Sequence, residues 1–186
     1  MGALVYSALA SLDGYTVDEA GGFGWAEPRP AVHRFINEIE AAVGTMLLGR
    51  RMYETMRVWD TGFELAKQFA FIADYQRLWQ GSDKVVYSRT LAKVRTRRTT
   101  LETTFDPVTV AERARASDRD TSIGGATLAA TALAAGIVDE VRWFVVPVTV
   151  GGGTPFLPRG LELSLDLREE RRFADGTVYL RYAVRA

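Results

Sequence analysis

Three short apolar segments of this chain are each followed by residues suited to binding an anion. The first segment is followed by Gly49, Arg50, Arg51 and Met52, and the second by Ser88, Arg89 and Thr90. The third segment ends at Ile123 and is followed by Gly124, Gly125, Ala126, Thr127 and Leu128. Glycine lets the backbone approach a phosphate, arginine and hydroxyl groups donate hydrogen bonds to it, and a helix that begins after Gly-Gly offers unpaired N–H groups. Each segment alone is compatible with an ordinary turn, but together they predict a site that holds a dinucleotide at several points.

Apolar periodicity and turn residues indicate which elements position these segments. We expect strands at 5–12, 45–48, 84–87, 120–123, 138–150, 161–173 and 177–184, and helices at 30–43, 50–57, 63–79, 107–116 and 126–135. Residues 13–30 are rich in Gly, Asp, Glu and Pro and read as a long loop of the kind that forms lids, and residues 93–98 as a solvated edge strand. This order predicts one three-layer α/β/α domain over residues 1–186, with a mostly parallel sheet and an antiparallel C-terminal hairpin. In such sheets ligands bind beyond the carboxyl ends of the strands.

The composition limits the classes of function. The 23 basic residues balance the 23 acidic ones, so no overall field favours nucleic acid or an anionic membrane. The chain has no run of eighteen apolar residues and no signal-peptide pattern at its start, so we expect a cytoplasmic protein without a membrane span. It has no cysteine and one histidine, which argues against disulfides and a bound metal.

The residue types nominate several side chains for catalysis or substrate contact without deciding among them. Asp13 and Glu27 could act near a reacting group, although Asp13 is followed by glycine and is first of all a turn residue. His33 lies beside Asn37 and Glu40 on the predicted helix, off its apolar stripe, so we expect a solvated side chain rather than a proton donor. Trp25 could stack on a flat substrate or anchor its loop.

The three anion-binding segments resemble the dihydrofolate reductase superfamily. Residues 45–54 resemble its strand-Gly-Arg-helix segment, residues 86–90 its adenosine-phosphate loop, and residues 123–128 the Gly-Gly turn before its pyrophosphate helix. Residues 7–15 and 146–156 are similar to the reductase domain of the bacterial riboflavin deaminase-reductase. The motifs occur in the same order over most of the chain, so the resemblance implies a dihydrofolate reductase-like fold.

The resemblance implies NADPH as the cofactor and hydride transfer as the reaction. By matching motifs, Gly49, Arg50, Arg51 and Met52 line the cofactor, and Ser88, Arg89 and Thr90 hold its 2′-phosphate. Ile123, Gly124, Gly125, Ala126, Thr127 and Leu128 cradle the pyrophosphate, and Ala8 and Val17 lie near the nicotinamide. Apart from the matched motifs, we expect Trp25 and Tyr53 to contact the substrate. The residue chemistry agrees, because the Ser88–Thr90 loop lacks the carboxylate with which NAD enzymes bind the ribose.

The implied reaction is reduction of a small heterocyclic or ribosylamine substrate, similar to that of 5-amino-6-(5-phosphoribosylamino)uracil reductase. Dihydrofolate reductases carry a carboxylate early in the first helix, where this chain has Val32 and His33, so we expect dihydrofolate to be a poor substrate. The alternatives are a related reductase of another small carbonyl or imine, and a non-catalytic nucleotide-binding dimeric domain.

We also expect a homodimer. The run 138–150 is apolar on both faces from Phe144 onward, which suits a central strand or a buried interface. Related riboflavin reductases pair through this region. The alternative is that helices of the same subunit cover both faces.

Overall fold

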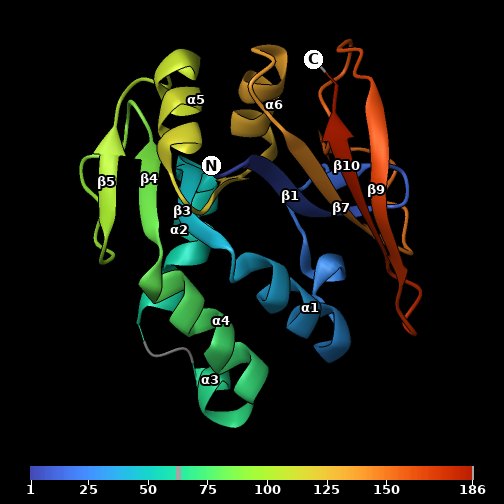
Figure 1. Ribbon diagram of the computed structural model, residues 1–186. Coiled ribbons are helices and arrows are strands. Elements are labelled where there is room, and N and C mark those ends of the chain that lie inside the picture. The colour runs from blue at the N-terminus through green and yellow to red at the C-terminus, as the bar shows by residue number, and fades with distance from the viewer. Residues whose placement is uncertain (62–63, 186) are drawn as a thin grey trace.

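The structure, a computed structural model, describes residues 1–61 and 64–185 and is built around one eight-stranded sheet (Figure 1). The strand order is β5-β4-β3-β6-β1-β7-β10-β9. The strands from β5 to β7 run parallel, and β10 pairs antiparallel with both β7 and β9. The bounds are Leu4–Ser11 for β1, Val43–Gly49 for β3, Asp83–Tyr87 for β4, Thr99–Glu102 for β5, Asp120–Gly124 for β6, Glu140–Val146 for β7, Leu165–Arg172 for β9 and Val178–Val184 for β10. This is the predicted mostly parallel sheet with a C-terminal antiparallel hairpin.

Helices cover both faces of the sheet and complete the three layers (Figure 1). One face carries α5 (Pro107–Ala116) and α6 (Ala126–Ala134), whose alanines and valines pack on Leu4, Tyr6 and Leu47. The other face carries α1 (Pro30–Glu40), α2 (Arg50–Met56) and α4 (Ala70–Gly81). The described part of the chain contains no helix long and apolar enough to span a bilayer.

Several predicted boundaries were wrong for identifiable reasons. The expected helix 63–79 is divided into α3 (Glu64–Gln68) and α4, because Phe69 between them has an extended backbone, with φ −128° and ψ 119°; Phe63 lies outside the described residues. The helix expected at 30–43 ends at Glu40, since Val43 and Gly44 already belong to β3. Residues 93–98 form no strand, and the edge strand β5 begins at Thr99.

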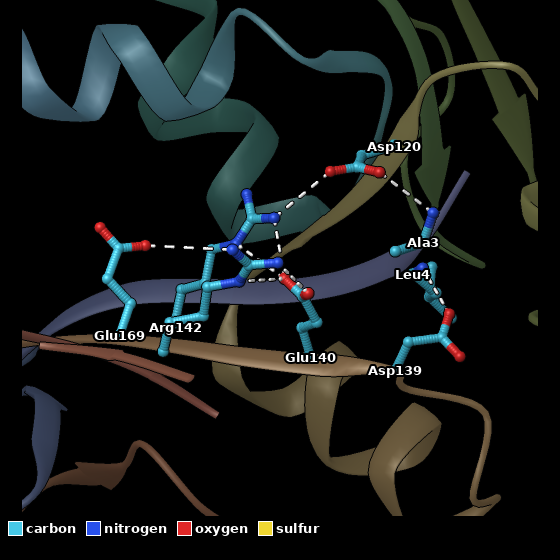
Figure 2. Close-up of polar contacts among 8 residues, drawn as sticks. Ala3, Leu4, Asp120, Asp139, Glu140, Arg142 and Glu169 are labelled. Atoms are coloured by element: carbon cyan, nitrogen blue, oxygen red, sulfur yellow. Dashed lines mark hydrogen bonds and ion pairs between the residues drawn. The ribbon is translucent and has the colours of Figure 1, made fainter. Parts of the chain in front are cut away.

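The amino ends of the strands carry a buried network of charges (Figure 2). Arg142 on β7 binds the carboxylates of Asp120, at 3.3 Å, and Glu140, at 2.9 Å, and Glu140 also accepts hydrogen bonds from Arg181 on β10. Although burial raises the pKa of Glu140, the hydrogen bonds from Arg181 and Arg142 lower it overall, so this carboxylate stays ionised. Asp120 also accepts the N–H of Ala3, which ties the start of β1 to this edge. The charges of Asp120, Glu140, Arg142 and Arg181 therefore satisfy one another.

Candidate functional site

The three segments that the sequence predicts to bind an anion lie side by side at the carboxyl edge of the sheet. Strands β4, β3 and β6 are consecutive and parallel, and they end at Tyr87, Gly49 and Gly124. Strand β1 follows next in the sheet and ends at Ser11. The loops after these four strands therefore form one continuous surface, which is the place where open α/β sheets bind their ligands.

The loop after β4 is joined to the start of α2 by side-chain contacts. Arg50 Nη1 donates to Thr90 Oγ1 at 2.8 Å, while its Nε pairs with Glu54 at 2.9 Å. Ser88 Oγ accepts the N–H groups of Thr90, at 3.2 Å, and Leu91, at 3.0 Å, which fixes the turn. Exposed Arg89, by contrast, makes no ion pair or side-chain hydrogen bond with residues 1–61 or 64–185. The loop thus presents an uncommitted guanidinium beside two ordered hydroxyl groups.

Helix α6 begins at the Gly-Gly turn with its N-terminus open. Gly125 is its N-cap, has a φ of +102° and supplies no side chain, so the N–H groups of Ala126, Thr127 and Leu128 have no partner within the helix. Helix α5 differs, because the Asp106 carboxylate accepts the N–H groups of its first turn. An open helix N-terminus attracts an anion through these amides and the helix dipole.

The two glycines of this turn are also required by the protein itself. A Cβ on Gly124 would lie 2.7 Å from Cδ2 of Leu48 and 3.1 Å from Cγ of Met52. A Cβ on Gly125 would lie 3.4 Å from Cβ of Met52, and the positive φ there disfavours any side chain. The glycines alone therefore do not identify a ligand site, and the open amides of α6 carry that argument.

The loop after β1 is pinned along its first half. Ser11 Oγ accepts the N–H of Tyr15 at 2.9 Å, and β2 (Tyr15–Val17) pairs with β8 (Thr154–Pro155). The Asp13 carboxylate accepts the N–H groups of Val150, at 3.1 Å, and Gly151, at 2.8 Å. The lid predicted at 13–30 is therefore anchored up to Val17, and its second half carries the 3₁₀ turn Gly24–Ala26.

The three catalytic candidates occupy unlike environments. The hydrogen bond from Ser11 is the leading cause that lowers the pKa of Asp13, so this carboxylate is ionised near neutral pH and acts as a loop anchor rather than a proton donor. Glu27 is exposed, and its side chain makes no hydrogen bond or ion pair with the described residues. The expectation for His33 was wrong: the side chain is 7% exposed, because Phe71 and Tyr75 of α4 pack on that side of α1.

The remaining predicted contacts divide between surface and core. Tyr53 is buried, and its hydroxyl accepts the N–H of Arg95 at 2.8 Å, which makes it a core residue and corrects its assignment to the substrate. The Ile123 side chain also packs in the core, so only its backbone borders the site. Ala8 and Leu128 pack at the edge of the same core, Val17 lies in β2, and Trp25 is half-buried.

The candidate site at the carboxyl edge is not the largest hollow of the described structure. A hollow of 640 Å³ lies between α1 and α4 at the opposite edge of the sheet, where Ser82 and Arg119 precede β4 and β6. A smaller one of 220 Å³ lies beside the end of β1, between Tyr15, Trp143 and Arg159. Unpaired donors at the ends of β4 and β6, rather than a deep pocket, therefore distinguish the candidate site. The described residues contain no group of His, Cys, Asp and Glu arranged to hold a metal ion.

The comparison with protein families gives a single assignment for nearly the whole length. Residues 3–180 match the model of the RibD C-terminal domain. The chain belongs to the RibD C-terminal domain family. Membership of this family explains why the three segments follow the order expected for a riboflavin-pathway reductase-like fold.

Known relatives of this RibD C-terminal domain are distant in sequence. The uncharacterized protein YyaP of Bacillus subtilis (strain 168) is 24% identical over 183 residues, which cover 96% of this chain and 93% of that protein. A putative riboflavin biosynthesis protein from Shewanella sp. PV-4 matches with a TM-score of 0.76 and 19% identity, covering 99% of both chains. A pyrimidine reductase-like protein from Corynebacterium diphtheriae matches at 0.72 and 14%, over 100% of this chain and 92% of that one.

Some of the solved structures contain this fold as part of a longer protein. The deaminase/5-amino-6-(5-phosphoribosylamino)uracil reductase of Thermotoga maritima matches with a TM-score of 0.66 and 12% identity. The match covers 99% of this chain but 57% of that protein. The resemblance to these solved structures shows the shared fold.

Proposed function

We propose that this RibD C-terminal domain is an NADPH-dependent reductase that transfers a hydride to a small heterocyclic or ribosylamine substrate. The observation that carries the proposal is the presence of free donor groups at the ends of β4 and β6, on either side of β3. These are the hydroxyl groups of the Ser88–Thr90 loop and the guanidinium of Arg89 after β4, and the open amides of α6 after β6. Two donor sites separated by one strand suit a ligand with two separated phosphate groups.

The residues present fit NADPH in a specific way. The amides of Ala126, Thr127 and Leu128 would hold the pyrophosphate, because α6 begins at this edge after a glycine and has no side-chain cap. Ser88, Arg89 and Thr90 would hold the 2′-phosphate, with Arg50 keeping Thr90 in place. When bound, the cofactor supplies the hydride. The protein supplies the position of the substrate and a site partly shielded by the loop that Asp13 anchors.

A direct test is a screen of NADPH oxidation, monitored by absorbance, against the pyrimidine ribosylamine, dihydrofolate and simple quinones. We expect turnover with a nitrogen heterocycle or ribosylamine. In the same experiment, titration calorimetry with NADPH separates binding from catalysis. NADPH binding without turnover of any compound would favour the non-catalytic nucleotide-binding alternative, and absence of NADPH binding would contradict the proposal.

We further propose that the protein is a homodimer that pairs through the C-terminal hairpin. On the α1 side of the hairpin, Tyr179 is buried against Phe35. On the other side Leu180 and Tyr182, opposite Trp143 and Val141 in the register, are only half-buried, and Leu167 is 49% exposed. A two-fold pair would cover this apolar surface. Light scattering at micromolar concentration tests it, since a mass near 20.6 kDa would mean a monomer.

A further inference from the structure

A hollow of 220 Å³ beside the end of β1 lies between the start of the lid and the segment after β7. The lid contributes residues 13–15 to its lining, the segment after β7 contributes residues 155–157 and Arg159, and β7 itself contributes Trp143. Pockets that hold drug-sized ligands measure about 300–1,000 Å³. This smaller hollow therefore suits a molecule with a single ring.

Most of the lining is apolar and rests on a fixed stack of aromatic rings. Trp143 stacks on Phe156, with ring centroids 4.9 Å and planes 27° apart, and Phe156 stacks on Tyr6 at 4.7 Å and 21°. Tyr6 and Phe156 are buried, and the Tyr6 hydroxyl donates to the carbonyl of Phe156 at 3.0 Å. Because these rings are already ordered, a flat ligand can pack on the apolar lining without a large entropic cost to the protein.

The polar groups of the hollow favour an anion at one end. Arg159 Nη2 donates to the hydroxyl oxygen of Tyr15 at 3.1 Å, and the guanidinium makes no ion pair within the described part of the chain. Asp13 also lines the hollow, but its carboxylate already accepts backbone N–H groups of the segment after β7. An anion is therefore expected beside Arg159, where the guanidinium can bind both oxygens of a carboxylate and the Tyr15 hydroxyl can donate to it.

The indole N–H of Trp143 is a further donor beside the hollow. Its Nε1 is buried and has no hydrogen-bond partner among the described residues, although the residue lines the hollow. A buried donor without a partner costs free energy, which a ligand oxygen that enters beside the ring would recover. The hollow thus combines flat apolar surface with donors and has no acceptor that stands free.

We propose that this hollow is a further ligand site, which binds a small aromatic carboxylate with its ring against Trp143 and its carboxylate on Arg159 and Tyr15. The occupant joins the lid to the segment after β7, because Tyr15 belongs to β2 and Arg159 follows β8. The site uses none of the residues proposed to hold the phosphates of the cofactor. It is proposed whatever the substrate of the protein, and its test requires no cofactor.

Titration calorimetry at low salt tests the site with benzoate, with benzamide, which has the same ring but no charge, and with cyclohexanecarboxylate, which has the charge but no flat ring. We expect benzoate to bind about tenfold more tightly than benzamide, the worth of one charge-assisted hydrogen bond, and more tightly than cyclohexanecarboxylate.

Two arginine variants serve as a matched pair in this titration. Arg159→Gln should abolish the preference for benzoate over benzamide, and Arg172→Gln, on the exposed edge strand β9, should retain it. Four outcomes would each overturn the proposal: no binding of benzoate, equal affinities for benzoate and benzamide, equal affinities for the flat and the puckered acid, or an unchanged preference in Arg159→Gln.

The position of the bound carboxylate is checked by NMR of protein labelled with ¹⁵N at tryptophan. The chain has four tryptophans, so Trp143→Phe identifies the indole N–H signal of Trp143 by its loss. Benzoate should shift this signal, and Arg89→Gln, which alters the proposed cofactor surface, should leave the benzoate affinity unchanged. A shift confined to the other indole signals, or a benzoate affinity that depends on Arg89 instead of Arg159, would overturn the proposal. Absence of NADPH binding with benzoate binding intact would count against the proposed function alone.

Discussion

Replacement of Glu40 should stabilise the protein above neutral pH. Glu40 is the last residue of α1, and its carboxyl group is enclosed near the network of Arg142 and Asp120. Burial raises its pKa from 4.5 to about 7, Arg142 opposes the rise, and Asp120 adds to it. The two nearby guanidinium groups are already bound by Asp120 and Glu140, so an ionised Glu40 is an excess negative charge.

The sign follows from the pKa difference between the two states. Because the folded pKa is raised, the stability contributed by protonated Glu40 is complete below about pH 4.5 and is lost as the pH rises through about 7. Each unit of separation between the two pKa values is worth about 1.4 kcal/mol, so the rise from 4.5 to about 7 gives roughly 3.5 kcal/mol as an upper limit. The residue keeps some solvent exposure that screens its charge, so about 1–2 kcal/mol is the reasonable expectation.

Urea unfolding at pH 5.5 and pH 8.5 measures this contribution. Glu40→Gln, which cannot ionise, should raise the free energy of unfolding relative to wild type, and the gain should be about 1 kcal/mol larger at pH 8.5 than at pH 5.5. Glu38→Gln is the matched control, because Glu38 is exposed on the same helix. An equal gain at both pH values, or the same pattern in the control, would refute the reasoning.

Three further predictions concern the cofactor and substrate. Arg89→Gln should reduce the preference for NADPH over NADH by about tenfold in titration calorimetry at low salt, while Arg172→Gln on the exposed edge strand leaves it unchanged. Gly125→Ala and Gly136→Ala, both at positive φ, should each lose about 1–2 kcal/mol of stability in urea unfolding, but only the Gly125 variant should bind NADPH more weakly. Dihydrofolate should be turned over slowly in the NADPH assay, since α1 has Val32 and His33 early in the helix, and robust turnover would point to Glu27 as an acid.

The sequence predicts the sheet well because its signals are local. Each central strand is a short apolar run that ends in glycine or a polar turn, and the helices between them have an apolar stripe or a Pro start. The predictions from sequence fail where contacts between distant elements determine whether a residue is buried. His33 lies off the apolar stripe of α1, yet α4 buries it, and nothing in the sequence of α1 indicates that a second helix packs there. The available sequence signal for this packing was the pair of aromatic residues Phe71 and Tyr75, which are four residues apart and so lie on one face of α4.

The candidate site was predictable by residue type but not by role. Arg50 matches the expected position, but the structure commits it to Thr90 and Glu54 and leaves Arg89 as the unpaired cation. Tyr53 follows the same motif, but its hydroxyl orders the backbone at Arg95. Which side chain of a motif faces a ligand depends on the turn after the strand, and the spacing of residues along the chain does not determine this.

The two edges of the sheet show how charge is divided between stability and binding. At the amino edge the carboxylates of Asp120 and Glu140 are paired with the guanidinium groups of Arg142 and Arg181, so these residues have little free-energy reason to bind an added ion (Figure 2). At the carboxyl edge the first amides of α6 and the guanidinium of Arg89 have no partners among residues 1–61 and 64–185. Unpaired donors there reduce stability slightly in the free protein, and an anion that binds all of them recovers that energy as affinity. The asymmetry is the physical reason to place the cofactor at the carboxyl edge rather than in the larger hollow between α1 and α4.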